Sequence, residues 1–180
     1  MSLPARIFFS AALGLLAATA HADLKPGDPF PSLAAAGLSG TLPATAGRVV
    51  LVDFWASWCA PCKASFPAYA KLQADYAARG LVIVAVSVDE NPAAYEKFVK
   101  NLHPPFATVH DRAQQLVREV KVPTMPTCYL IGADGKVRSV HQGFHGEDSE
   151  RELRKEIESL LAETTRADSP PATPMPVPPP

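Results

Sequence analysis

Hydrophobic residues in the middle of the chain form two uninterrupted runs separated by a stretch with helical spacing. The runs are 48–55 (RVVLVDFW) and 81–89 (LVIVAVSVD), and both are rich in valine, which is typical of buried strands in parallel sheets. In the segment 60–80 between them, aromatic and aliphatic residues recur at intervals of three and four, and a glycine ends the segment. This spacing predicts a helix that stops at the glycine and is kinked at Pro67. The order strand, helix, strand predicts a βαβ unit with parallel strands.

The rest of the pattern adds an antiparallel part of the sheet and further helices. Residues 127–143 form two strand-like runs around an Asp134-Gly135 turn, which is typical of a hairpin. Turn residues and short apolar pieces at 23–47 predict a small N-terminal hairpin. The remaining predicted elements are a helix at 91–102 opening near Pro92, a short strand at 105–110, a brief helix at 111–120 capped by Asp111, and an amphipathic closing helix at 147–163.

The two ends of the chain depart from this globular pattern. Residues 1–22 combine Arg6, an apolar stretch and the ending Ala20-His21-Ala22, which is the pattern of a secretory signal peptide cleaved near Ala22. An uncleaved membrane anchor is the weaker interpretation, because the apolar stretch falls short of the roughly 20 residues that a spanning helix needs. Residues 165–180 are dominated by proline and predict a disordered tail, either an inert spacer or a ligand for a groove.

Composition limits the remaining 23–164 to one domain of ordinary charge. A chain of 180 residues that is 47% hydrophobic supports one globular core but not two. The 17 basic residues nearly balance the 18 acidic ones, and no run of like charge predicts a nucleic-acid or membrane-surface patch. We therefore expect no nucleic-acid partner.

Three cysteines are present, and two of them form a CxxC motif in the segment 54–63 (FWASWCAPCK). A zinc site would need a second ligand pair, which is absent at usable spacing, and a c-type haem would need histidine where Lys63 stands. A purely structural disulfide between Cys59 and Cys62 would close a very small loop, where the gain in chain entropy is least. We therefore favour a reactive dithiol and expect no metal and no cofactor beyond a redox-active Cys59–Cys62 disulfide.

The position of the motif supports that chemistry. The CxxC follows a predicted strand and opens a predicted helix, where open α/β sheets usually hold their sites. Unpaired N–H groups and the helix dipole at this terminus favour the thiolate of Cys59, which can attack a disulfide. Cys62, one turn along the helix, can then attack the mixed disulfide and release the product.

Asp53 is a candidate proton acceptor. It lies inside an apolar strand, where an ionised carboxylate is costly to bury unless it is paired or used. At the strand end it could lie beneath the dithiol with a raised pKa and accept the proton of Cys62 during resolution. The alternative is an aspartate that is solvated or paired at the end of the strand.

Two separated motifs resemble the thioredoxin superfamily. They are 49–63 (VVLVDFWASWCAPCK), similar to its active-site segment, and 120–137 (VKVPTMPTCYLIGADGKV), similar to its cis-proline segment and following hairpin. Together with the secretory start, the resemblance over 25–163 points to the TlpA/ResA-like branch of exported thiol-disulfide oxidoreductases. It implies an α/β, three-layer fold: a central mixed β-sheet flanked by helices, with an N-terminal extension and an inserted helix and strand.

The resemblance also implies roles for single residues. Pro126 would be the cis-proline opposite the dithiol, leaving the backbone of Met125 to pair with a substrate strand. Trp58 would form the docking surface, and the alternative is that it only packs against its neighbours. Pro61 would influence the reduction potential, and the alternative is that proline is simply favourable in the first turn of a helix. Two departures stand out: many exported relatives carry asparagine in place of Asp53, and Ala85 replaces a lysine that neighbours the buried acid in thioredoxin.

The third cysteine and the histidines receive ordinary interpretations. We interpret Cys128 as a buried core thiol rather than a third redox partner. We expect His141 and His145 to lie at the surface, and Trp55 to pack in the core.

Three functions follow as hypotheses. The first is an exported, monomeric enzyme that reduces protein disulfides, in cytochrome c maturation or copper-site assembly, and is re-reduced by a membrane-bound thiol-disulfide electron donor. The second is a thiol peroxidase, although Ala56 stands where peroxiredoxins place a threonine. The third is a copper-binding chaperone or scaffold that uses the dithiol as soft ligands.

Overall fold

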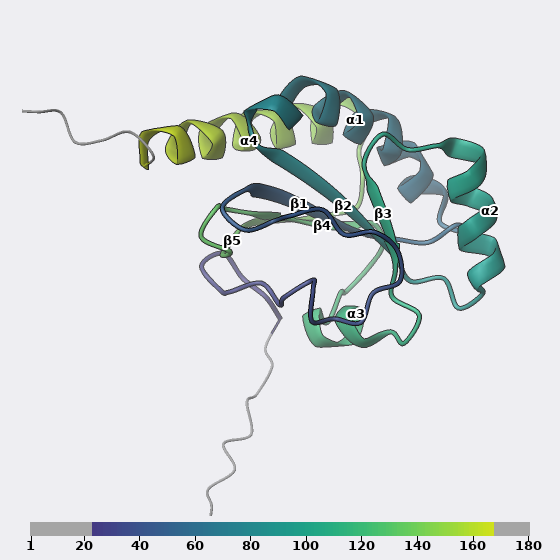
Figure 1. The fold of residues 1–180 in the computed structure, drawn as a ribbon. Helices are drawn as coiled ribbons and strands as arrows, with labels where there is room; N and C mark the ends of the chain where they lie inside the picture. Colours follow the sequence, from purple (N-terminus) through teal and green to yellow (C-terminus); the bar gives the residue numbers. More distant parts are fainter. Residues whose placement is uncertain (1–22, 168–180) are drawn as a thin grey trace, which may run out of the picture.

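A computed structural model describes residues 23–167, which form a five-stranded sheet with helices on both faces (Figure 1). The order of the strands is β3-β2-β1-β4-β5. The three strands β3, β2 and β1 are parallel, whereas β4 is antiparallel to both β1 and β5, so the sheet is mixed as predicted. The strands are β1 (Val49–Trp55), β2 (Leu81–Ser87), β3 (Ala107–His110), β4 (Thr127–Ile131) and β5 (Val137–Gln142).

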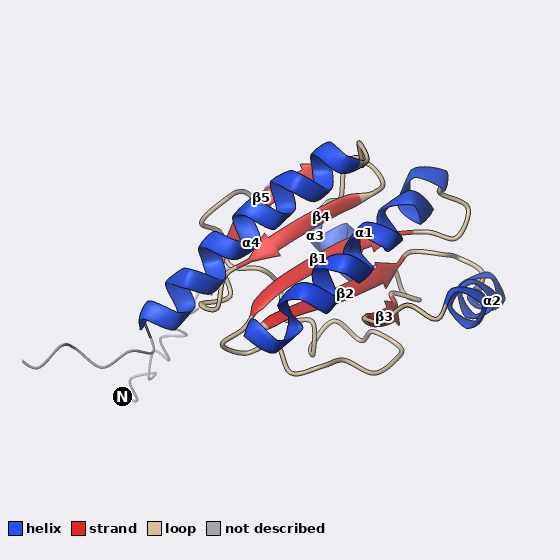
Figure 2. Cartoon of the chain, turned by 90° about the horizontal axis from the view of Figure 1, so that it is seen from above, coloured by secondary structure: helices blue, strands red, loops and turns tan. Residues whose placement is uncertain are grey.

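The helices make this a three-layer structure. Two long helices, α1 and α4, lie side by side across one face of the sheet (Figure 2), and α3 lies with the N-terminal segment on the other face (Figure 1). The inserted α2 packs beside β3. The helices are α1 (Ala60–Tyr76), α2 (Pro92–Leu102), α3 (Gln115–Val120) and α4 (Glu147–Ala167).

Local signals account for the ends of α1 and α2. Pro67 lies inside α1, which continues through a short 3-10 turn, and Gly80 then ends it in the left-handed conformation with φ of +114°. Asn91 caps α2 by accepting a hydrogen bond from the N–H of Ala93 at 3.0 Å. The predicted βαβ unit and the hairpin are both confirmed.

The short helix α3 is smaller than predicted. It begins at Gln115 rather than at residue 111, because Gln114 adopts the left-handed conformation and interrupts the turn before it. Asp111 still satisfies the start of the helix: its carboxylate accepts the N–H groups of Gln115 and Val117, both at 2.9 Å.

The prediction of an N-terminal hairpin in 23–47 is wrong. This segment forms no paired strands of its own in the described structure, and instead makes isolated bridges to the sheet through Pro29 and Ser39. Pro29 bridges Lys136 in the β4–β5 turn, and Ser39 bridges His110 at the edge of β3. The segment therefore forms backbone hydrogen bonds at both edges of the sheet.

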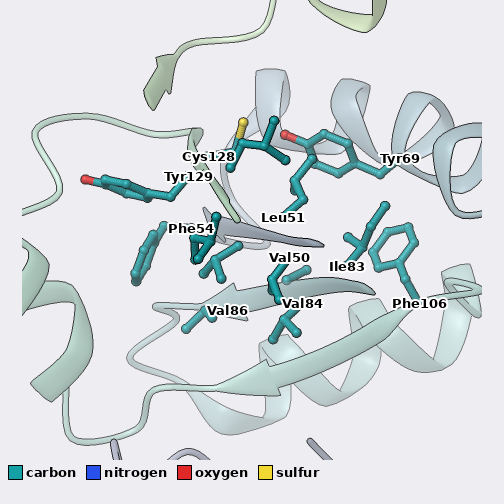
Figure 3. Close-up of a cluster of buried hydrophobic side chains, with 14 of the residues drawn as sticks. Val50, Leu51, Phe54, Tyr69, Ile83, Val84, Val86, Phe106, Cys128 and Tyr129 are labelled. Atoms are coloured by element: carbon teal, nitrogen blue, oxygen red, sulfur yellow. The ribbon is translucent and has the colours of Figure 1, made fainter. Parts of the chain in front are cut away.

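The core fills the space between the sheet and its helices. Leu153, Ile157, Leu160 and Leu161 of α4 are all buried, as the helical spacing predicts. Figure 3 shows side chains of the central strands meeting Tyr69 of α1, and the Tyr69 ring lies 6.3 Å from that of Phe106. This packing fixes α1, and with it the CxxC motif at its start.

The chain ends bear on two predictions. Helix α4 continues to Ala167, past the domain boundary predicted at residue 164. Residues 1–22 and 168–180 lie outside the described structure, so the signal peptide and the rest of the proline-rich tail stay predictions. Within 23–167, no helix combines the length and apolar character needed to cross a bilayer.

Candidate active site

The CxxC motif forms a disulfide at the start of α1. Cys59 is the N-cap residue of the helix, and its Sγ accepts a hydrogen bond from the N–H of Cys62 at 3.2 Å. The two Cα atoms are 5.3 Å apart. Pro61 occupies the first turn of the helix, where N–H groups have no partner within the helix, so its lack of an N–H costs no hydrogen bond. A sulfur at this point faces helix N–H groups that stabilise a thiolate once the disulfide is reduced.

One large side chain beside the disulfide is exposed. Trp58 has 69% of its surface open to solvent, whereas Cys59 is 5% exposed and Cys62 is fully buried. Trp55 packs in the core as predicted, with its ring 4.6 Å from Phe98. The attacking sulfur therefore lies at the surface edge of the site and the resolving sulfur lies beneath it.

The loop between β1 and the disulfide is held by Asp89, which follows β2. The buried Asp89 carboxylate accepts the backbone N–H of Ser57 at 3.0 and 3.1 Å and the Ser57 hydroxyl at 2.8 Å. It also accepts the hydroxyl of Ser87 at 2.8 Å, and its backbone carbonyl contacts Nε2 of the buried His110 at 2.6 Å. Asp89 thus connects the loop that carries Trp58 to the ends of two strands.

The cis-proline segment reaches the same end of the sheet. The Met125–Pro126 peptide bond is cis, as the resemblance implied. Thr127 pairs with Phe54 near the end of β1, which brings Pro126 to the strand end that leads into the disulfide loop. Pro126 is buried, and its carbonyl accepts the N–H of Gly143 at 2.7 Å. Among the described residues, the Met125 backbone takes part in none of the hydrogen bonds that join loops and strands.

Asp53 lies in the middle of the sheet and is fully buried. Its Oδ1 accepts a hydrogen bond from the hydroxyl of Tyr69 at 3.0 Å, and its Oδ2 has no partner among the described residues. Burial raises the pKa of the Asp53 carboxyl well above its ordinary value, and the Tyr69 hydrogen bond opposes that rise only in part. In this disulfide form, no hydrogen bond joins Asp53 to either cysteine of the motif. The neighbour of Asp53 in β2 is Ala85, so no cation from that position reaches the acid.

Cys128 is a free, buried thiol directly across from Asp53 in the β1–β4 pairing. Burial, and after it the charge of Asp53, raises the pKa of the Cys128 thiol far above its ordinary value. The expected buried core thiol is confirmed. What the sequence did not reveal is that it lies beside the candidate proton acceptor.

His141 is not the surface residue that we expected. It lies across from Cys128 on β5, its side chain is only 14% exposed, and its Nε2 contacts Glu156 of α4 at 2.8 Å. The hydrogen bond to Glu156 raises the pKa of His141 against the opposing effect of burial. Burial also pushes the pKa of Glu156 upward, but hydrogen bonds from His141 and Ser139 outweigh it and hold that pKa below its ordinary value. His145 is exposed, as expected.

Sequence reasoning missed three residues of the site: Tyr69, Asp89 and His141. Tyr69 was counted only as one of the apolar positions of its helix, and its hydroxyl carries no sequence signal. Asp89 follows an apolar strand, where a carboxylate is as costly to bury as that of Asp53. The same reasoning could therefore have identified it from the sequence. Within 23–167, no group of three or more His, Cys, Asp or Glu residues is arranged to hold a metal ion.

Comparison with known proteins agrees with this geometry. Residues 25–157 match a family model described as Redoxin. The chain is 36% identical over 97 residues to the thiol-disulfide oxidoreductase ResA of Oceanobacillus iheyensis, an alignment that covers 54% of this chain and 50% of that protein. It is 37% identical over 97 residues to ResA of Bacillus subtilis, covering 54% of each. The chain thus spans about half the length of these curated relatives.

A solved structure covers more of the fold. The crystal structure of a putative thiol:disulfide interchange protein DsbE from Chlorobium tepidum is 35% identical, with a TM-score of 0.71 over 77% of this chain and 99% of that one. The family match takes in the sheet, the CxxC motif and the cis-proline segment together. The chain therefore belongs to the redoxin family of the thioredoxin superfamily.

Proposed function

We propose that this protein is an exported thiol-disulfide oxidoreductase that reduces protein disulfides through Cys59 and Cys62. The observation that carries the proposal is the Cys59–Cys62 disulfide at the first turn of α1, with the Cys59 sulfur facing a helix N–H and the exposed Trp58 beside it. The relatives named thiol-disulfide oxidoreductase and thiol:disulfide interchange protein support the same reaction.

The reaction consists of two exchanges at sulfur. In the reduced protein, the Cys59 thiolate attacks a substrate disulfide, forms a mixed disulfide and releases one substrate thiolate, which takes a proton from solvent. Asp53 then accepts the proton of Cys62, whose thiolate attacks the Cys59 sulfur and breaks the mixed disulfide. The second substrate sulfur leaves as a thiolate and takes a proton from solvent, and Asp53 afterwards returns its own proton to solvent. Two electrons pass to the substrate, and the protein is left with the Cys59–Cys62 disulfide.

The substrate is proposed to dock across the disulfide. Trp58 offers an exposed aromatic surface on one side, and the Met125 backbone next to the buried Pro126 offers an N–H and a carbonyl that are unpaired among the described residues. An extended segment of a protein could pair with that backbone as an added strand. Pro61, which is exposed between the cysteines, would influence the reduction potential and border the docked segment.

The cellular setting belongs to the proposal as well. The leader pattern of residues 1–22 supports export to the periplasm or an equivalent oxidising compartment, where a reductase needs a supply of electrons. A membrane-bound thiol-disulfide donor would re-reduce the disulfide. The proposed substrates are disulfides of apocytochromes, in cytochrome c maturation, or of proteins that receive copper. We expect the protein to act as a monomer.

Cysteine variants test the chemistry. The reduced protein should reduce a disulfide-bonded protein substrate, and Cys59→Ser should abolish this activity. Cys62→Ser should accumulate a mixed disulfide between Cys59 and the substrate, detected by mass spectrometry and released by dithiothreitol. Retention of activity by Cys59→Ser would overturn the proposal. Peroxide consumption or retention of Cu(I) without exchange would replace it with one of the two other functions.

The reduction potential tests the direction of electron flow. We expect a value near or below about −250 mV when the protein is equilibrated with glutathione and dithiothreitol buffers, as for a reductant supplied by a donor. A value near −120 mV would show that the protein is an oxidant.

A further inference from the structure

The carboxylate of Asp53 is held by one hydroxyl and has no other hydrogen-bond partner among the described residues. Tyr69, itself 2% exposed, donates its hydroxyl to Oδ1 of Asp53 at 3.0 Å. The Oδ2 atom is buried and has no hydrogen bond among residues 23–167. A buried polar oxygen without a partner is costly, and such groups in native proteins call for an explanation such as a catalytic role.

A second buried hydroxyl of α1 lies beside the resolving cysteine. Ser65, fully buried one turn beyond Cys62, donates its hydroxyl to the Cys62 carbonyl at 2.8 Å. Helix α1 thus carries two buried hydroxyls, that of Ser65 close to the backbone of Cys62 and that of Tyr69 against the Asp53 carboxylate.

Within residues 23–167, no cation faces Asp53 from the elements packed against it. From β2 the neighbour is Ala85, from β4 it is the thiol of Cys128, and from α1 it is Tyr69. The His141–Glu156 pair of β5 and α4 lies one strand further away and acts on Cys128. Tyr69 is therefore the one group in the described structure that donates a hydrogen bond to the ionised acid.

We propose that Tyr69 is the positioning residue for proton transfer in the resolving step: its hydroxyl fixes Oδ1 of Asp53 and leaves Oδ2 as the oxygen that takes the proton of Cys62. This inference rests on the proposed function and deepens it. An oxygen that already accepts the Tyr69 hydrogen bond is the weaker site for a proton, so the proton goes to Oδ2. The transfer converts the Cys62 thiol to a thiolate and Asp53 to a neutral acid, and the thiolate then attacks Cys59.

Loss of the Tyr69 hydroxyl should change the titration of Asp53. The hydrogen bond stabilises the carboxylate, so Tyr69→Phe should raise the pKa of Asp53 further. We expect its midpoint, followed by ¹³C NMR of the labelled carboxyl with Asp53→Asn as the reference for assignment, to move up by about one pH unit or more. The rate of the resolving step, measured by stopped-flow tryptophan fluorescence, should increase with pH as Asp53 ionises. In Tyr69→Phe, the midpoint of this increase should move to higher pH by the same amount.

Tyr76→Phe is the matched control. Tyr76 lies on the same helix and is also buried, and its hydroxyl donates to Glu158 at 2.6 Å and accepts from Arg154 at 3.0 Å. This variant loses comparable hydrogen bonds from the same helix but should leave the midpoint of Asp53 and the pH profile unchanged. In an Asp53→Asn background, Tyr69→Phe should have no further effect on the resolving rate.

Each outcome is decisive. An unchanged Asp53 midpoint in Tyr69→Phe, or a shift in the midpoint without a shift in the rate profile, overturns the positioning role. A similar effect of Tyr76→Phe would show that the effect comes from general loosening of α1, and also overturns it. Failure of the proposed function itself would be distinguishable, because the unmodified protein would then show no disulfide exchange while its carboxyl titration remained measurable.

Discussion

Asp53 shows how one buried acid makes stability depend on pH. Its carboxyl has no cation beside it and a single hydrogen bond within the described residues, so burial dominates and the pKa is raised well above its ordinary value. The folded protein then keeps a proton that the unfolded chain releases above about pH 4. By linkage, this group's contribution to the free energy of unfolding decreases as pH rises from about 4 through the folded pKa, and then levels off.

Asp53→Asn should remove this pH dependence. Asparagine cannot ionise, so the stability of the variant relative to the unmodified protein should increase from pH 4 to pH 8, by about 1.4 kcal/mol for each unit by which burial raises the pKa. Urea unfolding at several pH values measures the difference. If the difference in stability between the variant and the unmodified protein stays constant with pH, whatever the size of that difference, the raised pKa of Asp53 is contradicted.

Cys128 should behave as an inert thiol in the folded protein. It is 3% exposed, and burial raises its pKa, so both access and thiolate formation are suppressed. In guanidinium, one thiol per oxidised chain should react with Ellman's reagent at once. In the oxidised native protein, we expect the rate of this reaction to be lower by about two orders of magnitude or more. Cys128→Ala should show no reactive thiol in either condition. Rapid reaction in the native state would contradict its placement in the core.

At the scale of elements, the structure brings together loops that the sequence keeps apart. The hydrophobic runs predicted β1, β2 and α1, because the periods of buried strands and helices are local properties of the chain. The cysteines were found for the same reason, since their spacing is local. The network of Asp89 joins Ser57 to a residue 32 positions away, and the bridge from Ser39 reaches His110. Such partners depend on how strands are ordered in the sheet, which the pattern alone does not specify.

The β1–α1 loop should depend on Asp89 for its conformation. Asp89→Ala would leave the Ser57 N–H, the Ser57 hydroxyl and the Ser87 hydroxyl without their acceptor. We expect the free energy of unfolding in urea to decrease by about 2–4 kcal/mol, because these buried and part-buried donors would be left without an acceptor and largely away from water. Ser57→Ala removes only one of these bonds and should cost about 1 kcal/mol. Equal effects of the two substitutions would show that the network does not depend on the carboxylate.

At the scale of the whole molecule, the N-terminal segment connects the two edges of the sheet. Near its start, the N–H of Gly27 donates to the carbonyl of Val137 at the beginning of β5, at 2.8 Å. Further along, Ser39 and His110 exchange hydrogen bonds of 2.9 and 2.8 Å at the edge of β3. Exposed edges can pair with other chains, so a segment that occupies them protects the sheet against such pairing as well as stabilising the fold.

Two glycines of this segment allow its packing against β3 to be tested. Gly27 and Gly40 both have positive φ, +99° and +119°, so alanine is strained at either position. A new Cβ at Gly40 would meet the Thr108 carbonyl oxygen at 3.1 Å and a Val109 methyl group at 3.3 Å. A new Cβ at Gly27 would have no atom of the described residues within 4 Å. Gly27→Ala should therefore cost about 1 kcal/mol from strain alone, and Gly40→Ala about 2–3 kcal/mol because the segment must also move away from β3.

The same two variants show whether the segment folds with the rest of the domain. If it is part of one cooperative unit, Gly40→Ala should lower the urea midpoint while tryptophan fluorescence and far-UV circular dichroism keep coincident transitions. Light scattering should also detect more association than for Gly27→Ala, because displacement of the segment uncovers the β3 edge. Equal costs for the two substitutions, or an early transition seen by one probe only, would mean that the segment is held on β3 too weakly to protect that edge.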